Sequence, residues 1–204
     1  MSLNALKAEI AKHYGTPAVV IDLDVVESNI ARVQAMCDAA GIANRPHIKT
    51  HKIPEIAKMQ IAAGAKGITC QKLGEAEIMA DAGIDDIFIS YNLLGEQKTG
   101  RLGRLLARTH VRVAADNPVV VDGLPHAGMS AGRPLEVMVE CDTGRKRAGV
   151  ETPQEAVRKA ELNSGRTIQS GSVVNLTSEQ WMERWKKGKE LPKLPMTEKL
   201  GTEK

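Results

Sequence analysis

The stretch Arg45-Pro46-His47-Ile48-Lys49-Thr50-His51-Lys52 decides how this chain is interpreted. Pro46 fixes its own φ and keeps the preceding residue out of the helical region, so His47–Lys49 is predicted to be a short strand. In that strand Ile48 faces a core and Lys49 points the opposite way. The neighbouring histidines and second lysine would add positive charge and lower the pKa of Lys49, which favours a nucleophilic neutral amine. The stretch therefore indicates a Schiff-base lysine, and a solvated surface lysine is the alternative.

On both sides of this stretch, strand-like and helical runs alternate. A helix over Leu3–His13 is expected to lead to a strand over Ala18–Asp22, and the next helix to begin near Asp24, a suitable N-cap, and to end at about Ala40. Five strand-like runs follow, namely His47–Lys49, Gly67–Gln71, Asp86–Tyr91, Thr109–Asp116 and Leu135–Asp142. The helical stretches that follow strands are Ile53–Ala63, Gly74–Ala82, Gly95–Arg108, Asn117–His126 and Pro153–Asn163. Strands separated by helices of this length indicate parallel βαβ units and an α/β fold.

Composition narrows the class of protein. The 204 residues, 42% of them hydrophobic, suffice for one domain with a sizeable core. No run has transmembrane length and no apolar leader begins the chain, so a soluble cytoplasmic protein without a membrane partner is expected. Cys37, Cys70 and Cys141 are predicted to be buried thiols in a reducing compartment. Basic and acidic residues balance up to residue 164 and the excess lies beyond it, so no nucleic-acid surface is expected.

Four stretches between Thr16 and about Val157 carry a family resemblance. They are Thr16–Asp24 (TPAVVIDLD), Arg45–Lys52 (RPHIKTHK), Gln71–Glu77 (QKLGEAE) and Asp142–Val150 (DTGRKRAGV). In this order and spacing they resemble the N-terminal part of the fold-type III pyridoxal-phosphate enzymes, within them the group of D-threonine aldolase and D-serine dehydratase. The last stretch is similar to an Asp-Thr-Gly-x-x-Arg-x-Gly signature shared with alanine racemases.

The resemblance implies a (β/α) TIM-type barrel of the alanine racemase N-terminal kind. A closed barrel needs eight strands and about 250 residues. About five barrel strands are expected here, so the barrel is predicted to be incomplete. Residues 1–163 are expected to form a partial cofactor-binding barrel domain, and residues 164–204 an atypical basic tail with one helix around Trp181 and Trp185. Whether this ending is natural or comes from a frameshift stays open.

The resemblance also assigns site residues. Lys49 would carry pyridoxal phosphate and act as a base at the substrate α-carbon. Arg147 would lie near the cofactor's phenolate oxygen, with Asp142 and Thr143 orienting it. Active sites of barrels lie at the carboxyl ends of the strands, and ordinary strand-end polarity is the alternative for the residues found there. The further cofactor-binding candidates at strand ends are Gln71, Tyr91, Asn92 and Asp116.

The expected reaction is a lyase reaction on a D-3-hydroxy amino acid, retro-aldol cleavage as in D-threonine aldolase. Dehydration of D-serine or D-3-hydroxyaspartate is the close alternative; racemisation and an inactive cofactor-binding fragment are the others. In the resembling family a divalent metal binds to a C-terminal β-domain, typically through a histidine two residues before a cysteine or aspartate. No histidine here has that neighbour, so no metal site is assigned. The resemblance also implies a homodimer, which an incomplete barrel disfavours.

Overall fold

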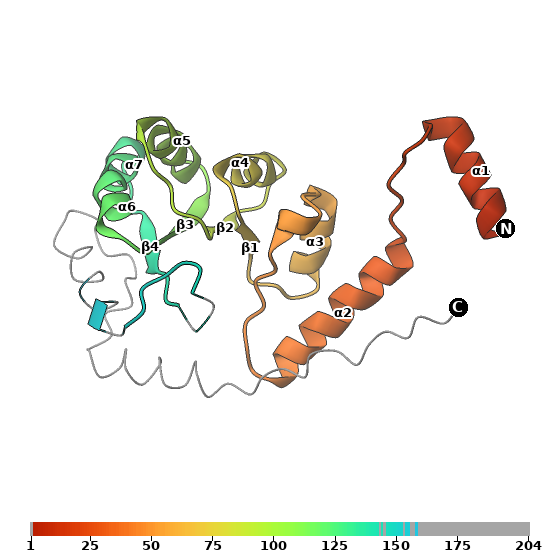
Figure 1. Ribbon diagram of the computed structural model, residues 1–204, viewed down its shortest axis with the longest axis horizontal. Helices are drawn as coiled ribbons and strands as arrows, with labels where there is room; N and C mark the ends of the chain where they lie inside the picture. Colours follow the sequence, from red (N-terminus) through yellow and green to blue (C-terminus); the bar gives the residue numbers. More distant parts are fainter. Residues whose placement is uncertain (1, 143, 145, 153, 156–157, 159–204) are drawn as a thin grey trace.

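A four-stranded parallel sheet lies at the centre of the chain in the computed structural model (Figure 1), which describes residues 2–142, 144, 146–152, 154–155 and 158. The strands are β1 (Ile68–Cys70), β2 (Asp86–Ile89), β3 (His110–Ala115) and β4 (Glu136–Val139), and they lie in the order β1-β2-β3-β4. Each strand therefore pairs with its neighbour in sequence, as βαβ units require.

Helices connect the strands and cover one face of the sheet (Figure 1). Those between strands are α4 (Leu73–Asp81), α5 (Glu96–Leu106), α6 (Pro118–Gly123) and α7 (Pro125–Ala131). Before β1 lie α1 (Leu3–Tyr14), α2 (Leu23–Ala39) and α3 (Pro54–Ala62). In Figure 1, α1 and α2 extend away from the sheet beyond α3. The regular alternation after residue 54 confirms the α/β class expected from the sequence.

The core lies between the sheet and its helices. Ile87 and Ile89 on β2 and Val111 and Val113 on β3 are fully buried on this side, two residues apart along each strand. They belong to the same apolar cluster as Met79 of α4 and leucines of α5. Burying each such side chain contributes about 1.5–3 kcal/mol, so this layer holds the strands in register.

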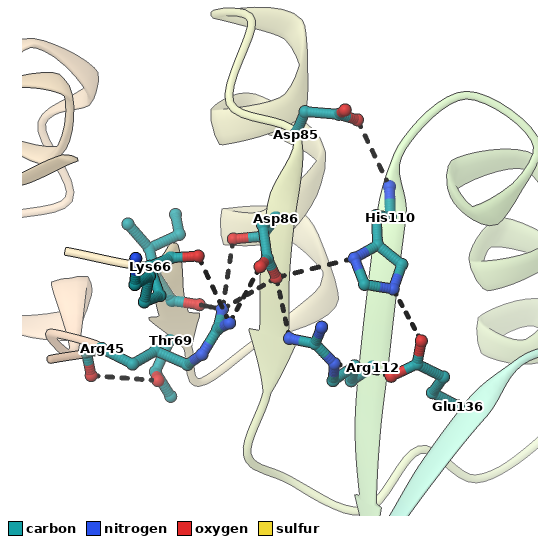
Figure 2. Close-up of polar contacts among 9 residues, drawn as sticks. Arg45, Lys66, Thr69, Asp85, Asp86, His110, Arg112 and Glu136 are labelled. Atoms are coloured by element: carbon teal, nitrogen blue, oxygen red, sulfur yellow. Dashed lines mark hydrogen bonds and ion pairs between the residues drawn. The ribbon is translucent and has the colours of Figure 1, made fainter. Parts of the chain in front are cut away.

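The opposite face of the sheet carries a charged network at the amino ends of the strands (Figure 2). The two Asp86 carboxylate oxygens each lie 2.9 Å from a guanidinium nitrogen of Arg45. Arg112 Nη1 donates to Asp86 Oδ1 over 2.9 Å, and Arg112 Nε donates to Glu136 Oε2 over 2.6 Å. His110 Nε2 lies 2.8 Å from Glu136 Oε1. Because these side chains are partly buried, their pairing links β2, β3 and β4 on the side away from the helices.

Two strand predictions are wrong. Ala18–Asp22 is not in a strand; it has no ladder partner among the described residues, and Val19 is 95% exposed. A strand exists only through a neighbouring strand, and hydrophobic residues alone do not supply one. The run His47–Lys49 also fails: His47 forms a single bridge with Thr69, and Ile48–Thr50 is a 3₁₀ helix.

Other boundaries also differ from the sequence predictions. The helix expected from Asp24 begins at Leu23, because Asp22 Oδ1 accepts the N–H of Val25 over 3.2 Å. The single helix expected over Asn117–His126 is two helices, α6 and α7, and α7 continues past His126 to Ala131. The sheet has four strands where five were predicted. The tail helix around Trp181 and Trp185, and most of the helix predicted over 153–163, lie outside the described residues.

Candidate functional site

The turn that carries Lys49 leaves the sheet next to β1. Pro46 C=O accepts the N–H of Thr69 over 2.8 Å, which joins this segment to β1 up to His47. The chain then turns into the 3₁₀ helix, where Ile48 is fully buried and anchors the turn in the core. Lys49 is exposed on this turn and does not lie in the strand expected from the sequence. The reason is the turn itself, which directs one side chain inward and the next into solvent.

His47 holds the start of this turn. Its Nδ1 accepts the N–H of Lys49 over 3.3 Å, which places the ring proton on Nε2, 3.4 Å from the hydroxyl of Ser90. The Ser90 hydroxyl in turn donates to Cys70 C=O. Burial and then the charge of Lys49 lower the pKa of His47, against an opposing effect of Glu75.

The histidines around Lys49 are therefore neutral at pH 7. Burial also lowers the pKa of His51, whose Nδ1 accepts the N–H of Ile53 over 3.0 Å. The expected positive charge from the two histidines is absent, because both rings are partly removed from water. Lys52 remains as the nearby cation, and its Nζ lies 3.6 Å from Glu75 Oε1.

The other predicted residues lie at the carboxyl edge of the sheet. Gln71 directly follows β1, Tyr91 and Asn92 follow β2, and Asp116 directly follows β3. Because all four strands are parallel, these loops lie at the same edge as the Lys49 turn. The Tyr91 side chain is 57% exposed there. The structure therefore gathers these residues on one edge, as the strand-end reasoning expected.

Asp116 connects the loops along this edge. Its Oδ1 accepts from the side-chain amides of Asn92 and Asn117, each over 2.7 Å, and its Oδ2 accepts the N–H of Gly149 over 3.1 Å. These donors come from the loops after β2, β3 and β4. The carboxylate thus orders three loops at once.

The loop after β4 carries the remaining predicted residues. Asp142 Oδ1 accepts the N–H of Gly144 over 2.8 Å, and Asp142 N–H donates to Val150 C=O. Arg147 is exposed on this loop, and Thr143 lies outside the described residues. Burial, and next the charge of Asp116, raise the pKa of Glu140, while Arg147 lowers it. Arg147 is therefore close enough to this edge to influence its charge.

Sequence reasoning missed several residues of this region. Glu75 is buried at the start of α4, where its Oε2 accepts the N–H groups of Gln71 and Lys72 over 2.9 and 3.3 Å. A glutamate at the third position of a helix that follows a strand was the available signal. Ser90 and Glu140 had no signal beyond their place at strand ends. The charged network of the opposite edge was signalled by the polar–apolar alternation of His110–Val113 and by the single acidic residue that begins each of Asp86–Ile89 and Glu136–Val139.

The described thiols are not poised for chemistry. Burial, and next the charge of Glu75, raise the pKa of Cys70 to about 12. Burial and Glu140 raise the pKa of Cys141 as well. Cys70 is buried as predicted, but Cys37 and Cys141 are only half-buried.

Among the described residues, no three His, Cys, Asp or Glu side chains are grouped as a metal ion would require. No helix within that part of the chain is long and apolar enough to cross a membrane.

The chain is similar to enzymes that act on D-3-hydroxy amino acids. Over 135 residues it is 43% identical to a D-threonine aldolase of an Arthrobacter species, covering 66% of this chain and 36% of that protein. Over 158 residues it is 35% identical to the D-threo-3-hydroxyaspartate dehydratase of Delftia sp. (strain HT23), covering 78% of this chain and 41% of that protein. The crystal structure of D-threonine aldolase from Filomicrobium marinum matches with a TM-score of 0.69 and 39% identity, over 72% of this chain and 40% of that one.

These matches confirm the barrel-type α/β fold and the resemblance stated from the sequence. The chain spans about two fifths of the length of the curated relatives it matches. The model of the alanine racemase N-terminal domain family matches residues 21–183, which is most of the chain. By this match, and by the parallel sheet with its lysine turn at the carboxyl edge, the chain belongs to the alanine racemase N-terminal domain family.

Proposed function

We propose that this chain is the cofactor-bearing part of a pyridoxal-phosphate-dependent lyase that acts on D-3-hydroxy amino acids. The supporting observation is the place of Lys49, exposed on a turn at the carboxyl edge of the sheet. Relatives that share this region cleave or dehydrate such substrates, as their names state. Retro-aldol cleavage of D-threonine is the proposed reaction.

The residues at the carboxyl edge of the sheet fit pyridoxal phosphate. An exposed lysine amine is free to attack an aldehyde, and His47 fixes the backbone from which it projects. Exposed Tyr91 lies on the same edge and offers a ring and a hydroxyl. Exposed Arg147 supplies a fixed positive charge for an anionic oxygen. Pyridoxal phosphate, when bound, supplies an electron sink for the charge that develops at the substrate α-carbon.

In this proposal, residues of the chain bind the cofactor, move a proton and position the loops. Lys49 holds the cofactor covalently and, once exchanged for the substrate amine, is available to move a proton at the α-carbon. Neutral His47 keeps the Lys49 backbone in place without adding charge. Asp116 orders the loops bearing Asn92 and Gly149 at the same edge of the sheet. Gln71, Asp142 and Thr143 complete the proposed cofactor-binding set.

Dehydration is the second candidate, because a D-threo-3-hydroxyaspartate dehydratase matches a larger share of this chain than the aldolase does. Both reactions begin at the same α-carbon and require a β-hydroxyl. The family resemblance also implies a divalent metal in the full-length proteins, with no ligand for it assigned in this chain, and a homodimer, which an incomplete barrel disfavours. A cytoplasmic location is part of the proposal, because the cysteines are free thiols.

Trapping the cofactor tests the central assignment. Incubation with pyridoxal phosphate, borohydride reduction and peptide mapping should place the label on Lys49 in the unmodified chain and in Lys52→Met, and remove it in Lys49→Met. Label on Lys52 in the unmodified chain would reject the assignment.

An activity assay tests the substrate class. The protein should release glycine and an aldehyde from D-threonine, or a keto acid and ammonia if it is a dehydratase, and leave the L-isomers unchanged. Efficient interconversion of L- and D-alanine would instead make it a racemase.

A further inference from the structure

Glu75 and Lys52 connect two segments that the sequence keeps 23 residues apart. Lys52 lies two residues after the end of the turn that carries Lys49. Its N–H donates to Ile48 C=O over 2.8 Å. Its φ of +55° is in the left-handed region, which reverses the chain there. Its ammonium nitrogen then lies 3.6 Å from the Glu75 carboxylate on α4.

The two carboxylate oxygens of Glu75 have different partners. Oε2 accepts the N–H groups of Gln71 and Lys72, which begin the loop between β1 and α4. Oε1 faces the ammonium of Lys52. The Glu75 side chain is only 9% exposed, and a buried carboxylate is costly unless it is paired. A neutral amide could also accept these two N–H groups, so the Glu75 charge has its ion-pair partner in Lys52, just after the Lys49 turn.

We propose that Glu75 is a positioning residue for Lys49, and that it acts by holding Lys52 and so the turn between them. We call the contact between Glu75 and Lys52 the turn clamp. The proposal rests on the proposed function of Lys49. The clamp fixes Gln71 and the Lys49 turn relative to each other, so both keep their places at the carboxyl edge when substrate exchanges.

The alternative is that Glu75 only caps α4, where a carboxylate is favoured by the helix dipole. The two roles differ in the effect of changing Lys52, which belongs to another element. Removing the Lys52 ammonium leaves both N–H bonds of Glu75 in place, so a pure cap would not respond. The clamp would respond, because the turn would lose its link to α4.

Amide hydrogen exchange of the full chain, followed by mass spectrometry, decides between them. Lys52→Met and Glu75→Gln should each speed exchange in residues 48–53 roughly threefold to tenfold, and Lys52→Arg should restore slow exchange. Lys58→Met on α3 is the matched control, since it removes an exposed lysine without touching Glu75, and it should leave this peptide unchanged. Unchanged exchange in Lys52→Met would overturn the proposal and leave Glu75 as a helix cap.

A second measurement links the clamp to Lys49. The rate at which borohydride traps pyridoxal phosphate on Lys49 should fall severalfold in Lys52→Met and recover in Lys52→Arg. An unchanged trapping rate in Lys52→Met would reject the positioning role. If the unmodified chain takes up no label, the proposed function fails, whereas the exchange measurement still decides whether the clamp exists.

Discussion

Gly67, just before β1, stands where no side chain fits. Its φ of +144° is in the region that favours glycine, and a Cβ there would lie 2.5 Å from the carbonyl oxygen of Asp86 and would also meet the guanidinium of Arg45. A β-carbon would therefore push β1 away from β2 at the charged network. We expect Gly67→Ala to lower the free energy of unfolding by about 2–4 kcal/mol, measured by urea denaturation.

Gly83 is the matched control for this substitution. Its φ of +88° is also in the region that L side chains rarely adopt, but nothing lies within 4 Å of the added carbon. Gly83→Ala should cost about 1 kcal/mol, which is the backbone strain alone. Equal losses in the two variants would show that the close approach of Arg45 and Asp86 to Gly67 is unimportant.

At the scale of elements, the charged network makes the sheet sensitive to acid. Burial would raise the pKa of Asp86, but Arg45, Arg112 and His110 outweigh it and hold that pKa below its usual range. Burial would raise the pKa of Glu136 too, but the hydrogen bonds and charges of His110 and Arg112 outweigh burial. The pKa of Glu136 is therefore also lowered. A lowered pKa in the folded state means that the stabilisation is complete above the unfolded value of about 4 and is lost as pH falls through the folded values. The urea midpoint should therefore drop steeply below about pH 4.

Arg112→Met tests the same network at neutral pH. It removes the guanidinium that pairs with both Asp86 and Glu136, and leaves His110 beside the two carboxylates on a partly buried surface. We expect a loss of about 2 kcal/mol, less than for a fully buried pair because solvent screens part of the charge. The pH dependence below 4 should also become shallower. Arg108→Met breaks an exposed pair with Asp81 and should cost below about 1 kcal/mol; equal losses would contradict a structural role of the network.

Asp116 joins elements at the other edge of the sheet. Asp116→Ala removes the acceptor for Asn92, Asn117 and the N–H of Gly149 together. Amide exchange at Gly149 and the neighbouring residues of its loop should rise at least tenfold, since an N–H bonded to a carboxylate is worth about 1.5–3 kcal/mol. Asp24→Ala, which changes an exposed aspartate on α2, is the control and should leave that loop unchanged.

At the scale of the whole molecule, the segment before α2 exposes a row of apolar side chains. Val19, Val20 and Ile21 are 95%, 60% and 42% exposed, and Leu23 and Val25 at the start of α2 are more than half exposed. Contiguous apolar surface of this kind favours association. The chain should elute from size-exclusion chromatography at increasing apparent mass as its concentration rises, and Val19→Asp with Val20→Asp should reduce this trend. An unchanged elution in that double variant would show that association uses another surface.

The sequence by itself determined the order of the elements and the edge on which the candidate site lies. The apolar runs of β1 to β4 alternate with helical periodicity, and parallel strands place their carboxyl ends together whatever the details of packing. That reasoning was sufficient to place Lys49, Gln71, Asn92 and Asp116 at the same edge of the sheet. The proposed cofactor came from the resemblance of the four quoted stretches to a known family, not from the strand order.

Only the tertiary structure decided where the strands end and which charges meet. Ala18–Asp22 has the composition of a strand but no partner to pair with, because pairing depends on what lies beside a segment in space. Pairing with β1 stops at the single bridge of His47, whose ring accepts the N–H of Lys49, a local bond that competes with a ladder. Glu75 meets Lys52, and Asp86 meets Arg45 and Arg112, across 23 to 41 residues of chain. Such contacts follow from how the layers pack, and that packing cannot be read from neighbours in the sequence.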